Sequence, residues 1–185
     1  MISFALLFPE LAHQETRVLQ TTTRPGLPQG AFALRESYCS ERGCDCRRVL
    51  INVVWLERDM HVATINYAFE PPPPPYEDEG QVFLDPLNPQ SGYSGPLLAL
   101  FEEMIADDAA YRERLIAHYT AWKRVVDDPA HPDQSKLLRM RREGGREPAR
   151  REAPKPLSGG AACPCGSGRK YRKCCKKSAL RQSPG

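Results

Sequence analysis

Val49-Leu50-Ile51-Asn52-Val53-Val54-Trp55-Leu56 is an almost unbroken apolar run, and it predicts a buried strand within residues 47–57. Upstream, residues 31–38 alternate and predict a strand with Phe32, Leu34 and Glu36 on one face. Residues 15–22 are rich in β-branched side chains and end at a turn-forming cluster at residues 24–30, so these two segments form a hairpin. After a turn at residues 58–60, residues 61–69 return as a fourth strand. The body therefore begins as an antiparallel β-meander.

Proline ends this sheet, because it has no N–H to donate to a strand ladder. Glu70 is followed by five prolines at residues 71–75. This run favours a stiff polyproline II connector over a ligand for a signalling domain. Residues 81–84 add a short edge strand before a loop rich in proline and glycine.

Two helices follow. Ser94 is a candidate cap and Pro96 lies in the first turn of the first helix; Asp107 or Asp108 caps the second. The apolar residues recur at helical spacing: Leu97, Phe101, Met104 and Ile105, then Tyr111, Leu115, Tyr119, Trp122 and Val126. The aromatic stripe is typical of core packing rather than of a ligand groove. Helix faces of this kind need a sheet to cover, so the fold class is α+β: a four- to five-stranded meander covered by two helices.

Charge divides the chain unevenly. Residues 1–135 carry 11 Lys and Arg against 20 Asp and Glu, a net of −9, whereas residues 136–185 carry 15 against 3, a net of +12. Residues 136–142 are predicted to form a short basic helix, and residues 143–160 are predicted to be a flexible tether. A basic arm on an acidic body indicates an anionic partner, either nucleic acid or an acidic protein face, unless the arm folds back on its own body.

The N-terminus is apolar over residues 1–8 but lacks a basic region and a small-residue cleavage site, so it does not resemble a signal peptide. No apolar run approaches the ~18 residues needed to span a bilayer. We therefore expect a cytoplasmic protein with one core and reduced thiols. The sequence does not define an oligomeric state.

The C-terminal segment Cys163-Pro164-Cys165-Gly166-Ser167-Gly168-Arg169-Lys170-Tyr171-Arg172-Lys173-Cys174-Cys175 has the pattern C-x-C-x8-C-C. Four thiolates satisfy tetrahedral Zn²⁺. Gly166 and Gly168 let the backbone reverse, and residues 169–173 have the length of one helical turn that presents the last two cysteines. Four protein ligands leave no open position, so the site would be structural. Disulfides are the weaker alternative, because adjacent cysteines are poorly placed to pair.

This segment resembles the SEC-C motif, the zinc-binding tail of the bacterial translocase ATPase that is also appended to many unrelated bacterial proteins. The resemblance implies one structural Zn²⁺ held by Cys163, Cys165, Cys174 and Cys175. It also implies a docking role for the tail, which in the translocase engages a secretion chaperone and the ribosome. The residues that would contact a partner are the aromatic and basic residues of the module: Arg169, Lys170, Tyr171, Arg172, Lys173, Lys176 and Lys177. The resemblance covers about fourteen residues and brings no ATPase motif.

The chain therefore divides into four parts. An α+β body occupies residues 1–128, and a basic flexible linker occupies 129–160. The SEC-C-like module spans 161–178, and a disordered tail completes the chain at 179–185.

A second cysteine cluster, C-x4-C-x-C, lies between two predicted strands at Cys39, Cys44 and Cys46. Zn²⁺ at this cluster needs a fourth ligand. If the hairpin pairs Thr22 with Ala31, His13 falls beside Ser40 and becomes the candidate, whereas His61 lies ~30 Å away along its strand. Reduced structural thiols and a redox pair of Cys44 with Cys46 are the alternatives to a second metal ion.

Nothing else in the sequence predicts catalysis. His118 lies at the edge of the helix stripe and His131 lies in a linker, while the pairs Asp107-Asp108 and Asp127-Asp128 suit helix caps. There is no phosphate loop, nucleophile elbow or H-E-x-x-H motif.

Three functions fit these observations. The first is a zinc-binding adaptor, not an enzyme, whose module docks a protein or ribosomal partner. The second is nucleic-acid or ribosome binding through the basic tail, with Tyr171 stacking. The third is a zinc-dependent enzyme at the body cluster, with one position open to water.

Overall fold

The computed structural model describes residues 1–72, 74, 80–144, 160 and 168–173. In these residues a single antiparallel sheet is built from β1 (Ile2–Ser3), β2 (Arg17–Thr21), β3 (Gly30–Tyr38), β4 (Arg48–Trp55), β5 (Met60–Ala68) and β6 (Val82–Leu84). The helices are α1 (Phe4–Leu7), α2 (Pro9–Glu15), α3 (Ser94–Asp107), α4 (Ala109–Asp127) and α5 (Gln134–Arg142), with 3-10 turns at Leu56–Arg58 and Tyr171–Lys173.

Strands β2 to β6 form an antiparallel meander in sequence order, as the turn signals predict. The run at residues 49–56 supplies β4, the central strand of this meander. Its side chains Ile51 and Val53 lie opposite Ile65 and Ala63 of β5 and are fully buried. The predicted α+β class is confirmed.

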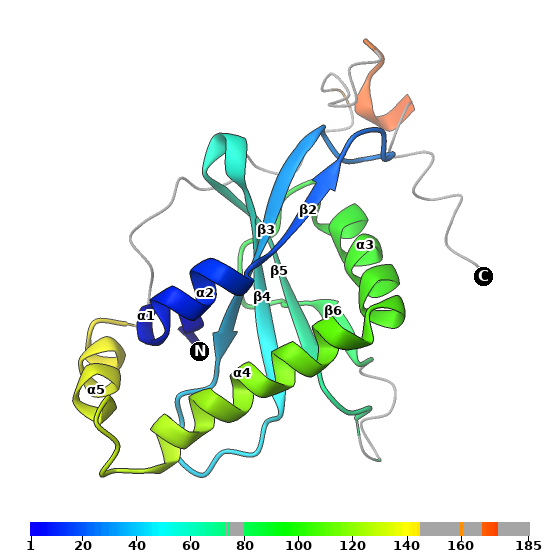
Figure 1. Ribbon diagram of the computed structural model, residues 1–185. Helices are drawn as coiled ribbons and strands as arrows, with labels where there is room; N and C mark the ends of the chain where they lie inside the picture. Colours follow the sequence, from blue (N-terminus) through cyan, green and yellow to red (C-terminus); the bar gives the residue numbers. More distant parts are fainter. Residues whose placement is uncertain (73, 75–79, 145–159, 161–167, 174–185) are drawn as a thin grey trace.

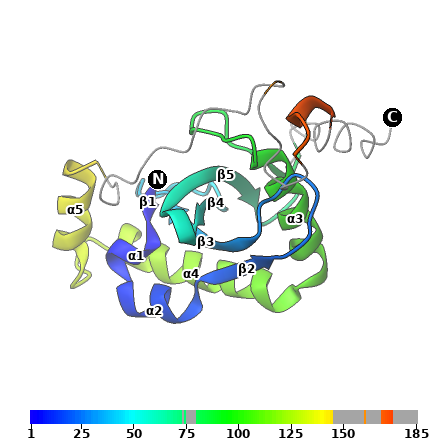
Figure 2. The same ribbon diagram turned by 90° about the horizontal axis from the view of Figure 1, so that it is seen from above.

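Helices α3 and α4 cover one face of the sheet, and α4 runs across β3 and β4 (Figures 1 and 2). The predicted aromatic stripe of α4 faces the core: Trp122 and Leu115 are fully buried. The Tyr38 hydroxyl oxygen on β3 lies 3.1 Å from the carbonyl oxygen of Leu115, and the rings of Phe69 and Tyr119 lie 5.4 Å apart. None of the described helices is both long enough and apolar enough to cross a bilayer.

Helix capping follows the sequence in one place and departs from it in another. The Asp108 carboxylate accepts from the N–H of Tyr111 at 2.9 Å and caps α4, as predicted. Ser94, in contrast, is the first residue of α3 and its hydroxyl donates to the carbonyl of Ser91, so it does not cap that helix.

The edge of the sheet beside β3 differs from the prediction. Both β1 and β2 pair with this edge: Ile2 lies opposite Tyr38, and Thr21 lies opposite Gly30. The two strands act as one interrupted strand from which residues 4–15 leave as α1 and α2. Pro9 starts α2, because a proline in the first helical turn forgoes no hydrogen bond.

Helix α5 extends the folded body beyond residue 128. The predicted basic helix at residues 136–142 is confirmed, and its side chains Leu137 and Met140 are buried in the same core as the sheet. The Lys136 ammonium donates to the carbonyl of Leu7 at 3.0 Å. The packed body therefore reaches Arg142, and most of the tether predicted at residues 143–160 lies outside the described residues.

Candidate metal centre

The loop between β3 and β4 gathers the three body cysteines. The sulfur atoms of Cys39, Cys44 and Cys46 all lie within 4.8 Å of one another. Three sulfurs bound to one Zn²⁺ at about 2.3 Å would be roughly 3.8 Å apart, so a movement of about 1 Å closes the cluster around an ion. Gly43, at φ +70°, makes the reversal in the loop, and the N–H of Cys44 donates to the carbonyl of Glu41 at 3.3 Å.

Helix α4 holds this loop in place. The Trp122 indole N–H donates to the carbonyl of Cys39 at 2.8 Å. Asp127 accepts from the N–H of Gly43 and from the ammonium of Lys123, each at 2.9 Å. Beyond α4, Arg141 of α5 forms an ion pair with Glu41 at 3.0 Å. The cluster is therefore positioned by side chains that lie far from it in the sequence.

The Cys44 and Cys46 thiols differ in acidity. Hydrogen bonds from the backbone and then the side chain of Cys46 lower the pKa of Cys44. Burial, and next the Cys44 and Cys39 sulfurs, raise the pKa of Cys46 to about 12. Cys44 is therefore more acidic than Cys46, and a metal ion that binds here displaces the thiol protons as it forms its thiolate bonds.

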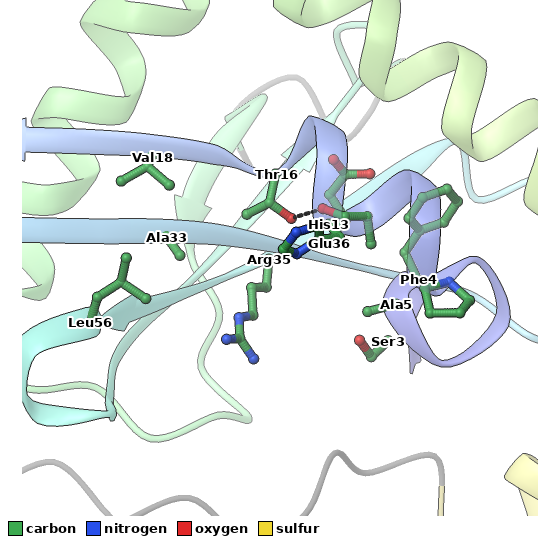
Figure 3. Close-up of a pocket in the computed structure, with 12 residues that line it drawn as sticks. Ser3, Phe4, Ala5, His13, Thr16, Val18, Ala33, Arg35, Glu36 and Leu56 are labelled. Atoms are coloured by element: carbon green, nitrogen blue, oxygen red, sulfur yellow. Dashed lines mark hydrogen bonds between the residues drawn. The ribbon is translucent and has the colours of Figure 1, made fainter.

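The structure does not bring His13 to this cluster, and the predicted register is wrong. His13 lies in α2 because residues 9–15 are helical, and Ile2 rather than Glu15 lies opposite Tyr38. His13 instead lines a groove of about 530 Å³ between α2 and the interrupted edge of β3 (Figure 3). His61, the poorer candidate, pairs with Val54 of β4, and its ring contacts the Thr64 hydroxyl at 2.9 Å.

A buried charged network was missed by the sequence reasoning. His118 is only 4% exposed, so its prediction as a helix-edge side chain is wrong. Its Nδ1 lies 2.8 Å from Glu36 of β3, and its Nε2 lies 3.1 Å from Glu15 of α2. Glu36 also accepts from the Tyr38 hydroxyl at 2.7 Å. The available signal was Glu36 itself, because a carboxylate on the apolar face of a strand needs a partner.

Charge stabilises His118 in its protonated form. Burial lowers the pKa of the imidazole, but the Glu36 and then the Glu15 carboxylates together raise it by more, so the pKa lies above its ordinary value. With both ring nitrogens directed at carboxylates, the imidazolium joins α4, β3 and α2. The network is a structural bridge with no ring nitrogen left for a substrate.

The tail is described only at residues 168–173. Gly168 has φ +68°, in agreement with the predicted reversal, and Tyr171–Lys173 forms a 3-10 turn closed by the N–H of Lys173 on the carbonyl of Lys170 at 2.9 Å. The side chains of four predicted contact residues are exposed: Arg169, Lys170, Arg172 and Lys173. The predicted ligands and the last two lysines lie outside the described residues: Cys163, Cys165, Cys174, Cys175, Lys176 and Lys177.

Comparison with known proteins identifies one feature. A family model for the SEC-C motif matches residues 161–177, which confirms the resemblance and includes all four tail cysteines. The match covers 17 of 185 residues and leaves the body unassigned. No curated protein and no solved structure matches the chain. The chain thus carries a SEC-C motif at its C-terminal end, and this motif and the body cluster together indicate metal binding.

Proposed function

We propose that this protein is a zinc-binding adaptor whose SEC-C motif docks a protein or ribosomal partner. The observation that carries this proposal is the motif match at residues 161–177, which places four cysteines inside a strongly basic segment. Four thiolates around one Zn²⁺ would fix the fold of so short a module, because metal binding supplies the folding energy that a small core cannot. The module would then present its basic side chains on a fixed surface.

Electrostatics supports docking as the role of the module. Arg169, Lys170, Arg172 and Lys173 are exposed within five consecutive residues. Residues 143–185, beyond the packed body, carry 11 Lys and Arg against 3 Asp and Glu, a net of +8, and a structural tetrathiolate site takes about two charges from this total, which leaves the segment basic. The body carries the opposite charge, so the two parts suit different partners, as an adaptor requires.

Three of the four histidines of the body take part in contacts within the fold, which supports assigning no catalysis to them. Both ring nitrogens of His118 contact carboxylates, and His61 contacts Thr64. The Nδ1 atom of His131 accepts from the N–H of Asp133 at 3.1 Å. The fourth, His13, lies in α2 at the groove beside β3, so a general base at the cysteine cluster would have to come from another residue type.

Zinc content and partner capture together test the proposal. Full-length protein and the Cys174→Ser/Cys175→Ser variant are compared by native mass spectrometry and by affinity capture from bacterial lysate. The variant should lose one Zn²⁺ and the captured partner. A partner retained by the zinc-depleted variant would overturn the adaptor role of the module.

Nucleic-acid binding is the second candidate, favoured by the exposed basic residues 169, 170, 172 and 173. Contacts with phosphates weaken steeply as salt rises, because binding releases condensed counterions. Nuclease treatment before capture separates a protein partner from nucleic acid and from the ribosome, whose RNA it degrades. Loss of the captured material after nuclease would favour nucleic acid or the ribosome, and its retention would favour a protein partner.

A further inference from the structure

We propose that Cys39, Cys44 and Cys46 form a second, independent metal site, in which three thiolates hold a thiophilic divalent ion and the fourth position takes an exchangeable small ligand. This inference goes beyond the adaptor function and does not depend on the tail. The ligand class is water or a small thiol. The site would thus bind its metal within the body and remain open to solution chemistry.

The fold supplies the preorganisation that such a site needs. Cys39 follows the last residue of β3, and Cys46 precedes the first residue of β4 by two positions, so paired strands fix both ends of the loop. Trp122, which is fully buried, holds the carbonyl of Cys39, and Asp127 holds the N–H of Gly43. The sulfurs are therefore gathered before any ion arrives, and binding costs little ordering entropy.

Charge around the loop suits a bound thiolate complex. Three thiolates and one divalent ion carry a net charge of −1. The side chain of Lys123 is only 13% exposed; its ammonium bonds Asp127 at 2.9 Å and lies 3.4 Å from the carbonyl of Glu41 in the same loop. This cation offsets part of the negative charge that the complex brings to the end of α4.

Among the described residues, no fourth His, Cys, Asp or Glu ligand atom joins the three sulfurs within 4.8 Å. The two carboxylates that hold the loop are engaged: Glu41 pairs with Arg141, and Asp127 accepts from Gly43 and Lys123. His13 lies in α2, and the strand register that would have placed it beside the cluster does not occur.

Exposure gives an external ligand a route to the ion. All three cysteines are half-buried, while Gly43 and Asp45 between them are exposed. A four-coordinate ion with three protein ligands keeps a position for water or substrate, which is the arrangement of reactive rather than structural zinc sites. When the ion binds, the thiol protons pass to solvent and three metal–sulfur bonds form.

Cobalt substitution tests this proposal. The probe is Co²⁺ added under argon to the full-length Cys163→Ser/Cys165→Ser/Cys174→Ser/Cys175→Ser variant, which retains the body thiols alone. We expect one Co²⁺ per chain with sulfur-to-metal charge-transfer absorption, and a shift of the visible bands when β-mercaptoethanol is added. Absence of stoichiometric Co²⁺ binding would overturn the site, and bands insensitive to the thiol would overturn the open position.

Single substitutions in the same background identify the ligands. Cys44→Ser should weaken Co²⁺ binding at least tenfold, and circular dichroism verifies that the fold persists. Asp45→Asn is the matched control, because Asp45 is exposed and lies between two proposed ligands. His13→Ala should leave the spectrum unchanged. A changed spectrum in either control variant would make that residue the fourth ligand and contradict the proposal.

Discussion

The two cysteine clusters differ in what brings their sulfurs together. In the tail, four cysteines lie within thirteen residues, and the local spacing alone suffices for a tetrahedral site. In the body, the loop that contains Cys39, Cys44 and Cys46 is positioned by Trp122, Asp127 and Arg141, which come from α4 and α5. A site of the first kind depends on its own residues, whereas a site of the second kind depends on the stability of a whole domain.

The largest expected effect separates the clusters directly. Cys174→Ser/Cys175→Ser removes two of four thiolates and should abolish the tail ion, whose apparent binding energy in small zinc modules is about 10–16 kcal/mol. The melting temperature of the body should not change, because the described core ends at Met140. Native mass spectrometry and thermal denaturation measure both, with Ser167→Ala as the control. A body that melts at lower temperature in the cysteine variant would show that the clusters are coupled.

His118→Gln should destabilise the body by about 3 kcal/mol, because it leaves the Glu36 carboxylate buried without its cation. The tail ion should remain bound, while metal binding at the body cluster should weaken with the fold. Urea unfolding measures the loss. His131→Gln is the matched control, since the His131 side chain is 29% exposed. Equal stability of the two variants would contradict a stabilising role for the buried network.

The same network predicts a dependence on pH. The pKa of His118 is raised in the folded protein, so its contribution to stability is fully present below the ordinary histidine pKa of about 6.5. This contribution is lost as pH rises through the raised pKa of the folded state. The urea concentration at the unfolding midpoint should fall as pH rises across this range in the natural protein, and it should change less in the His118→Gln variant. A midpoint that rises over the same range would reverse the assigned protonation state.

A smaller effect is expected at the loop itself. Trp122→Phe leaves the carbonyl of Cys39 without its donor and should cost about 1–2 kcal/mol. Trp55→Phe is the matched control, because the buried Trp55 indole N–H has no hydrogen-bond partner among the described residues. Metal affinity of the body cluster should fall in the first variant and persist in the second. Chelator competition measures this difference, and identical affinities would remove Trp122 from the support of the loop.

The smallest effect tests electrostatics. Lys123→Gln removes the cation beside the loop and should weaken body metal binding severalfold, an effect that added salt reduces. Arg124→Gln removes an exposed charge from the same helix and serves as the control. Chelator competition at low and high ionic strength provides the measurement. Equal losses in both variants would indicate a general charge effect rather than a specific one.

Local patterns predicted much of the fold. Hydrophobic spacing specified β4 and α4, and turn-forming residues marked the ends of the strands. These elements are found where they were expected. The edge of β3 was not predictable in the same way, since residues 9–15 form a helix where the hairpin register extended a strand. Pro9 starts this helix, and β1, which pairs with β3 instead, is a two-residue strand too short to give a recognisable sequence pattern.

The residues of the candidate site were likewise predictable only where they lie close together in the sequence. Spacing alone identified the three body cysteines, because residues near in sequence stay near in space. It could not exclude His13, whose position depends on strand register, nor find the contact of His118 with Glu36, which are 82 residues apart. Tertiary contacts of this kind are absent from local sequence patterns.

The hydrogen bond from Trp122 to Cys39 also makes the body cluster optically visible. The chain has two tryptophans, and the other, Trp55, lies at the opposite end of β4 from the cysteine loop. Fluorescence of Trp122 should respond when an ion enters the loop, while Trp55 supplies an internal reference that does not. In a Trp55→Phe background the single remaining indole becomes a built-in reporter, by which occupancy of the body cluster can be followed in time without a label.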